Sequence, residues 1–304
     1  MSSIRGVFSA AASPVNADLS PDGAALAAHC RQLLDDGCHG IALLGSTGEA
    51  NSFSLEERRG LLEAVVAAGI PASALLPGTG LCALPETIAL TRHALDLGVT
   101  KVVMLPPFYY KGVSDQGLFD AYSRVFDALA DDRLQVILYH IPPISQVPLS
   151  LDLIARLIEK YPGTIAGVKD SGGQIDNMVA LARRFPALSI LAGADPLLLP
   201  LLQAGGAGCI TATSNLAARQ LRTVFDNFAD PAARAEVEAA QARIVALREA
   251  SNSFSQIPTI KAMIARRYDA PGWRRARPPL VSLGDEQIAS LYPLLDKVDE
   301  DHPA

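Results

Sequence analysis

The chain has 304 residues, 49% hydrophobic and 19% charged, which excludes a disordered protein and allows one large barrel or two modest domains. Its formal net charge of -6 and its lack of a long basic run exclude the charge pattern of a nucleic-acid-binding protein. Met1–Arg5 lacks the apolar segment of a secretory signal, and no window approaches the roughly 18 apolar residues of a membrane helix, so we expect a cytoplasmic protein without a membrane partner.

Strand and helix signals alternate along the chain as far as Asn215. Each short apolar run of strand character is followed by a longer segment of helical period. The expected strands are Gly6–Ser9, Gly40–Leu44, Ala74–Pro77, Lys101–Leu105, Gln135–Tyr139, Ile165–Lys169, Ser189–Ala192 and Gly208–Ala212. This alternation indicates a parallel sheet, and eight units favour an α/β fold of the closed (β/α)8 TIM barrel type over an open doubly wound sheet.

The segments between these strands carry helix start and stop signals. Ser54 and Glu57 form a predicted capping box that opens a helix over Leu55–Ala68. A proline in the first turn and a glycine after the last residue frame a helix over Pro85–Leu97, and a serine caps Leu151–Lys160.

After Asn215 the strand signal stops, and the chain becomes alanine-rich and helical. Helices are expected over Leu216–Ser251, Thr259–Arg267 and Asp285–Asp296. Because no flexible linker precedes them, we expect a barrel domain over residues 1–215 and a C-terminal helical region over residues 216–304 that packs on it.

Three further groups of residues are interpreted as structural and not as parts of a functional site. The four cysteines show no CxxC pair, so we expect reduced, buried thiols; they are Cys30, Cys38, Cys82 and Cys209. The basic patch of Arg274, Arg275 and Arg277 is expected to be a solvated turn or a subunit contact. The five histidines (His29, His39, His93, His140, His302) do not cluster at strand ends, so we expect no metal site.

In a (β/α)8 barrel the functional site lies at the carboxyl ends of the strands. Polar and aromatic residues follow five of the expected strands at that edge. They are Gly45–Glu49, Pro106–Tyr110, Tyr139 with His140, Lys169 with Asp170, and Gly193–Asp195.

Lys169 is the sharpest candidate. Strand alternation puts it on one face with Ile165 and Gly167, and if that face is turned to the barrel axis, the glycine leaves space beside the lysine. Loss of hydration inside an apolar barrel penalises an ammonium, and a neutral amine attacks a carbonyl to form an imine. A lysine that turns outward or pairs with a carboxylate remains the alternative.

Two further elements strengthen this hypothesis. Tyr139 lies on the strand next to that of Lys169, where its hydroxyl could move protons, although a strand tyrosine can equally be a packing residue. In Gly45–Glu49, glycines allow close approach of the backbone to a ligand, and Ser46 and Thr47 present hydroxyls and amides that suit a carboxylate. An ordinary tight turn is the alternative for this segment.

Taken together, these segments resemble the dihydrodipicolinate synthase/N-acetylneuraminate lyase family of class I pyruvate-dependent aldolases, across nearly the whole chain. The motifs similar to its carboxylate loop, aromatic loop, catalytic tyrosine motif and Schiff-base lysine strand are Gly45–Glu49, Pro107–Tyr110, Tyr139–Pro142 and Gly167–Ser171. They occur in the family's order.

The resemblance implies a lyase in which Lys169 forms an imine with pyruvate or a related 2-oxo acid and Tyr139 acts as acid and base. It implies that Ser46 relays protons between Tyr139 and Tyr110, the latter reaching in from a neighbouring subunit. No cofactor is implied beyond the covalent lysine imine. The family is typically tetrameric, so a homo-oligomer is expected.

The same resemblance implies the residues that bind substrate. Thr47 and the adjacent amides, including that of Gly48, would hold the carboxylate of the 2-oxo acid. Gly193 and Ile210 fall where the family lines the pocket beside the imine. The implied partners are a small 2-oxo acid and an aldehyde.

The chain departs from both well-known members of the family in the half of the site that binds the second substrate. Dihydrodipicolinate synthases carry an arginine two residues after the motif proline, but here Pro142 is followed by Pro143 and Ile144. An unpaired substrate carboxylate would cost on the order of a few kcal/mol, so we do not expect lysine-biosynthetic activity. Sialic acid lyases place an acidic pair after the glycine of the seventh strand, whereas Asp195 is followed by Pro196.

Residues around Ser171–Gly173 and Ile144–Gln146 are expected to line this second half and to suit a small or moderately polar chain. His140 stands where these families commonly have asparagine, and by alternation it is expected to form hydrogen bonds between the strand and helix layers.

The first hypothesis is a Schiff-base aldolase or lyase that cleaves or joins a 2-oxo acid, such as a deoxy sugar acid or a hydroxy-oxo-dicarboxylate, and alternatives remain open beside it. The same imine chemistry can dehydrate a 2-oxo sugar acid, and the same barrel can bind a 2-oxo acid without catalysis. A metal-dependent aldolase is set aside because the histidines form no ligand set.

Overall fold

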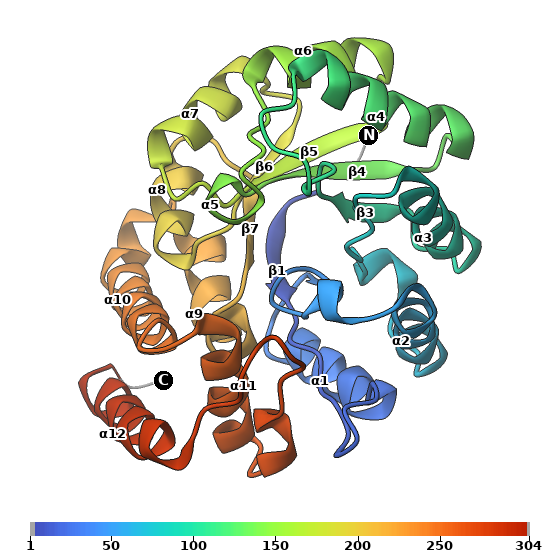
Figure 1. The fold of residues 1–304 in the computed structure, drawn as a ribbon. Coiled ribbons are helices and arrows are strands. Elements are labelled where there is room, and N and C mark those ends of the chain that lie inside the picture. The colour runs from blue at the N-terminus through green and yellow to red at the C-terminus, as the bar shows by residue number, and fades with distance from the viewer. Residues whose placement is uncertain (1–3, 303–304) are drawn as a thin grey trace.

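The computed structural model describes residues 4–302, and its centre is a ring of parallel strands surrounded by helices (Figure 1). The strands are β1 Gly6–Ala10, β2 Gly40–Ala42, β3 Lys101–Met104, β4 Gln135–His140, β5 Ile165–Asp170, β6 Ser189–Ala192 and β7 Gly208–Thr211. They hydrogen-bond in the order β2-β1-β7-β6-β5-β4-β3. The predicted α/β barrel fold is therefore confirmed.

The segment expected to be the third strand, Ala74–Pro77, is not a regular strand. Its start lies in a short 3-10 helix over Ala72–Ala74. The rest still bridges β2 and β3, because Leu76 N donates to Ile41 O at 2.9 Å and Pro77 O accepts from Val103 N at 3.0 Å. Proline has no N–H to donate to a strand ladder. The barrel is thus closed by an irregular segment, and the prediction of a strand here is wrong.

The helices around the barrel follow the predicted starts closely. They are α1 Gly23–Asp35, α2 Leu55–Ala67, α3 Leu84–Asp96, α4 Asp115–Leu129, the short α5 Pro142–Ser145, α6 Leu151–Lys160, α7 Ile175–Arg184, α8 Leu198–Gln203 and α9 Ser214–Asn227. The capping box is present: Ser54 Oγ accepts from Glu57 N at 3.2 Å, and the Glu57 carboxylate accepts from Ser54 N at 2.8 Å.

Strand alternation divides the buried apolar residues into two layers. One cluster includes Phe8, Val103, Ile137, Tyr139, Leu191 and Ile210, which come from five of the strands. The alternate strand residues, such as Val7 and Val102, belong instead to the larger cluster that includes the helices. The first cluster therefore fills the inside of the barrel, because side chains along each strand point alternately inward and outward.

The C-terminal region differs from the prediction in one respect. The stretch Leu216–Ser251 is expected to be helical throughout, but α9 Ser214–Asn227 and α10 Arg234–Ser251 are separated by a break. Pro231 opens a 3-10 turn between them, and proline cannot continue a helix without losing a hydrogen bond. Two further helices follow, α11 Gln256–Arg267 and α12 Asp285–Asp301.

Helices α10–α12 lie together beside the barrel, coloured orange to red in Figure 1. Helix α9 packs against β1, and α10 packs against α9 and α12. The boundary between residues 215 and 216 stays a prediction. Within residues 4–302 no helix is both long and apolar enough to cross a bilayer.

Two smaller predictions need correction. All four cysteines are free thiols, and three are buried, but Cys82 is exposed. Arg277 is not part of a solvated turn: its guanidinium contacts the Glu57 carboxylate at 2.7 Å and lies 4.4 Å from the centre of the Phe53 ring. Its backbone N also donates to the Glu49 carboxylate at 2.9 Å. This arginine therefore joins the C-terminal segment to the loop after β2.

Candidate active site

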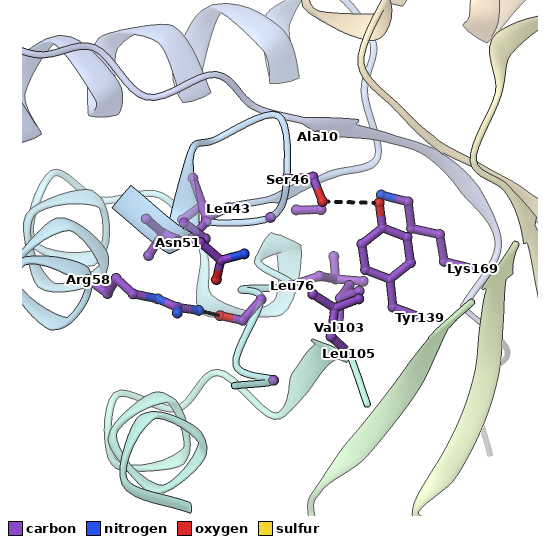
Figure 2. Close-up of a pocket in the computed structure, with 16 residues that line it drawn as sticks. Ala10, Leu43, Ser46, Asn51, Arg58, Leu76, Val103, Leu105, Tyr139 and Lys169 are labelled. Carbon is purple, nitrogen blue, oxygen red and sulfur yellow. Dashed lines mark hydrogen bonds between the residues drawn. The ribbon is translucent and has the colours of Figure 1, made fainter. Parts of the chain in front are cut away.

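Lys169 and Tyr139 meet inside the mouth of the barrel. The register of β4 and β5 places them directly opposite each other. Lys169 is only 5% exposed, and its Nζ lies 4.1 Å from the centre of the Tyr139 ring. Figure 2 shows the lysine side chain running alongside the tyrosine ring. The alternative in which this lysine turns outward is therefore wrong.

Gly167 has a different role from the one expected of it. We expected it to leave space beside Lys169, but a Cβ at this position would lie 2.3 Å from the backbone oxygen of Ser189. The glycine therefore permits the close approach of β6 to β5. The alternation of side chains along the strand identified the face that Gly167 shares with Lys169. It did not show that the space at Gly167 is needed by the backbone of β6.

The loop after β2 brings Ser46 to the tyrosine. Ser46 Oγ lies 3.5 Å from the Tyr139 hydroxyl, a long hydrogen bond drawn as a dashed line in Figure 2. Two non-glycine residues of the loop, Leu44 and Glu49, have left-handed backbone conformations with φ of 54° and 53°. Such conformations are uncommon outside glycine and persist where the surrounding contacts enforce them.

Contacts of the Glu49 side chain help to hold this backbone conformation. Its carboxylate pairs with the Lys261 ammonium of α11, and both side chains are fully buried. The backbone N of Arg277 donates to the other carboxylate oxygen. The C-terminal region thus fixes the loop that carries Ser46 and Thr47. Sequence reasoning missed Lys261, although a lone charge within the apolar run Ile260–Ala265 was a signal.

The environment of Tyr139 alters its acidity. Burial raises the pKa of the phenol, but the charge of Lys169 and hydrogen bonds from Ser46, Ser171 and Lys169 outweigh burial. The net result is a pKa below the usual value. A phenol that gives up its proton more readily is suited to proton transfer near neutral pH.

A cavity of about 310 Å³ opens beside these residues. Six of the predicted site residues line it: Ser46, Thr47, Tyr139, Lys169, Gly193 and Ile210. A Cβ on Gly193 would lie 2.8 Å from the backbone oxygen of Asp170, which cannot rotate away, so glycine is required there. Ser46, Tyr139 and Lys169 also line a smaller inner cavity of about 30 Å³, shown in Figure 2.

Two predicted site residues do not line the larger cavity. Gly48 belongs to the same loop but faces the backbone that follows β1, where a Cβ would be 2.9 Å from the backbone oxygen of Ala11. Tyr110 is 73% exposed and packs edge-to-face on Tyr109, with ring centres 5.3 Å apart. Within one chain, Tyr110 therefore lies on the surface.

His140 and Asp195 support the walls of the site. His140 Nδ1 accepts from Leu149 N at 3.1 Å, as expected for a side chain between strand and helix layers, and burial lowers its pKa against the influence of Asp170. Asp195, expected as half of an acidic pair, is fully buried and does not line the cavity. Its charge partner is Arg248 of α10.

Arg248, Gln256 and Ile257 line the cavity from the C-terminal helices, and sequence reasoning missed all three. They lie outside the strand ends on which that reasoning concentrated. Within the described residues, no three or more histidine, cysteine, aspartate or glutamate side chains gather as a metal site would require. The expectation of a site without metal or cofactor stays a prediction.

Comparisons with known proteins agree with this geometry. A sequence model of the dihydrodipicolinate synthetase family matches residues 3–297. The chain is 37% identical over 299 residues, 98% of each protein, to an uncharacterized DapA-like lyase from Chloroflexus aurantiacus.

Solved structures are similar over the same extent. The dihydrodipicolinate synthase of Agrobacterium tumefaciens is 30% identical, with a TM-score of 0.88 over 96% of this chain and 99% of that one. YagE, a prophage protein of the same family from Escherichia coli K12 in complex with pyruvate, is 25% identical, with a TM-score of 0.88 over 97% of this chain and 98% of that one.

Proposed function

Because the chain belongs to the dihydrodipicolinate synthetase family, whose members include lyases, we propose that it breaks or forms a carbon–carbon bond through an imine between Lys169 and a 2-oxo acid. The observation that carries the proposal is the amino group of Lys169, buried beside the Tyr139 ring and open to a cavity of about 310 Å³. The structure of a related chain in complex with pyruvate supports a 2-oxo acid as the ligand.

In the proposed cleavage, the neutral Nζ of Lys169 adds to the C2 ketone, and loss of water leaves a protonated imine. The C3–C4 bond then breaks. Its electron pair moves into an enamine, and the C4 hydroxyl gives up its proton, so C4 leaves as an aldehyde. Protonation at C3 and addition of water to the imine release pyruvate and the free lysine. Condensation follows the same steps in reverse.

Tyr139 is the group best placed to carry these protons, because its ring lies against Lys169 and its hydroxyl is within 3.5 Å of Ser46. We propose that Ser46 passes protons onward from Tyr139. Thr47 and the amides of the same loop are proposed to bind the carboxylate next to the ketone, since this loop lines the cavity that Lys169 enters.

Borohydride reduction tests the proposal directly. Treatment with pyruvate and borohydride should convert the imine to a stable secondary amine, and peptide mass mapping should locate one adduct at Lys169. Lys261 is an internal control, because it is fully buried in its pair with Glu49 and should stay unmodified. The variant Lys169→Met should form no adduct. An unmodified Lys169 in an enzyme that turns over 2-oxo acids would exclude the imine.

A coupled assay for pyruvate release across a series of 4-hydroxy-2-oxo acids gives the reaction type. Pyruvate formed in proportion to substrate lost identifies carbon–carbon cleavage. Loss of the substrate hydroxyl without pyruvate release would identify the dehydratase alternative, which uses the same lysine.

A further inference from the structure

The wall of the cavity that the C-terminal helices contribute carries an arginine. Among the described residues that line the cavity of about 310 Å³, the charged side chains are Lys169 and Arg248. Arg248 comes from the last turn of α10, and its neighbours on the wall include the apolar Ile257 and the small Ala194 and Ala212. The sequence leaves a deoxy sugar acid and a hydroxy-oxo-dicarboxylate open for the half of the site that binds the second substrate, and the arginine favours the dicarboxylate.

The charge of Arg248 is incompletely balanced by protein. Its salt-bridge partner is Asp195, but the closest atoms, Arg248 Nη1 and Asp195 Oδ2, are 3.7 Å apart, beyond hydrogen-bonding distance. Burial raises the pKa of Asp195, against the lowering effects of Thr211 and Arg248, which weakens its hold on a negative charge. The Arg248 side chain is 22% exposed, and Arg248 is one of the residues that line the cavity.

Gln256 orients the guanidinium without neutralising it. In one orientation of its amide, Gln256 Nε2 donates to Asn252 Oδ1 at 3.0 Å. With the amide turned so that its oxygen faces Arg248, this oxygen lies 2.6 Å from Nη1 and 3.0 Å from Nη2. Amide orientation is assigned from such hydrogen-bond partners. Gln256 itself lines the cavity, at the start of α11. The amide therefore adds no negative charge beside the guanidinium.

We propose that Arg248 binds a second carboxylate, at the end of the substrate remote from the 2-oxo group. This inference rests on the proposed function, because it names the substrate class of the same site: 4-hydroxy-2-oxo dicarboxylates, and hence an aldehyde that bears a carboxylate. One guanidinium matches one carboxylate by two parallel hydrogen bonds. A phosphate dianion would need more positive charge than the lining of this half supplies.

Matched substrates and variants test the proposal. The substrates are 4-hydroxy-2-oxo dicarboxylates of five, six and seven carbons, each paired with the compound in which an amide replaces the distal carboxylate. Arg248→Met removes the guanidinium and keeps an unbranched side chain. Arg234→Met is the control, because Arg234 lies on the same helix with its side chain 81% exposed.

In Arg248→Met, kcat/KM for the best dicarboxylate should fall by about 100-fold, mainly through KM, because binding common to ground and transition states is lost. The value for the matching amide should change by less than about threefold, since a neutral end gains little from the charge. Arg248→Lys keeps the positive charge but not the two parallel N–H groups of the guanidinium, so kcat/KM for the dicarboxylate should fall by an intermediate factor. Arg234→Met should match the wild type.

Reduction with pyruvate and borohydride separates this inference from the proposed function. Pyruvate lacks a distal group, so trapping at Lys169 should be equal in Arg248→Met and the wild type. Equal losses for dicarboxylate and amide, or a wild type that prefers the amides or cleaves no dicarboxylate, would overturn the role of Arg248 while leaving the imine intact. A wild type in which borohydride traps no pyruvate adduct would instead contradict the proposed function.

Discussion

The Lys169 amino group lies 4.1 Å from the centre of the Tyr139 ring, and its charge helps to set the acidity of that phenol. Burial is the largest influence on the pKa of Tyr139 and acts to raise it. The charge of Lys169 and hydrogen bonds from Lys169 and two serines outweigh that effect, so the pKa of Tyr139 lies below its usual value.

An ultraviolet titration of phenolate should resolve this coupling. The difference between wild type and Tyr139→Phe should show one phenol that ionises below pH 10, the usual value for tyrosine. In Lys169→Met, burial acts without the neighbouring charge, so the pKa of Tyr139 should rise above that of the wild type. The control Lys101→Met should leave it unchanged. A titration of Tyr139 that is identical in Lys169→Met would refute the coupling.

The buried pair of Glu49 and Lys261 should be a main determinant of stability. Lys261→Met leaves a carboxylate without its counter-charge where both side chains are 0% exposed, and should lower the free energy of unfolding by about 3–5 kcal/mol. Urea denaturation measures this. The double variant Glu49→Gln with Lys261→Met should recover part of the loss, because it removes the unpaired charge.

Arg234→Met breaks an exposed pair with Glu238 and serves as the control, with an expected cost within about 0.5 kcal/mol. If Lys261→Met were as mild as this control, the loop after β2 would not depend on the C-terminal region as we infer.

Gly193 should tolerate no side chain. A Cβ would lie 1.9 Å from Ser171 Oγ and 2.8 Å from the backbone oxygen of Asp170; the hydroxyl can rotate away, but the strand backbone cannot. Gly193→Ala should therefore destabilise the fold by about 1–3 kcal/mol and lower kcat/KM by at least about tenfold. Gly60 in α2 has open space around its Cβ position, so Gly60→Ala should stabilise by up to about 1 kcal/mol. Equal effects in the two variants would contradict this account.

The sequence predicted the centre of the site well because strand rules convert spacing into geometry. Parallel strands end at one edge and alternate residues share a face, so Tyr139 and Lys169 could be placed side by side before any coordinates were known. The third strand was mispredicted because apolar composition favours a strand, whereas its proline interrupts the ladder.

The contribution of the C-terminal helices was not predictable by the same rules. Lys261 and its partner Glu49 are 212 positions apart, and Arg248 enters the cavity only because α10 docks beside the barrel. From the sequence alone, a charged residue on a helix is interpreted as exposed to solvent, because the packing of that helix is not known. Long-range docking of helices, unlike strand register, leaves no fixed period in the sequence.

The exposure of Tyr110 motivates the last prediction, which concerns a second copy of the chain. It is 73% exposed beside Tyr109, and Val113 and Ile144 are exposed as well. Large apolar side chains that gather on one surface commonly mark a subunit contact. We expect a homo-oligomer in which Tyr110 of one subunit reaches the site of its neighbour, and light scattering should show no monomer at assay concentrations.

Mixing two inactive variants tests whether Tyr110 acts in its neighbour's site. Tyr110→Phe keeps Lys169, and Lys169→Met keeps Tyr110, so a hybrid pair contains one complete site. If the pairs are symmetric and mix at random, half are hybrids, and about a quarter of all sites should regain activity after co-expression. Tyr109→Phe mixed with Lys169→Met is the control for dilution alone. Activity no greater than the sum of the separate variants would mean that Tyr110 does not act across the interface, because every hybrid would still lack a complete site.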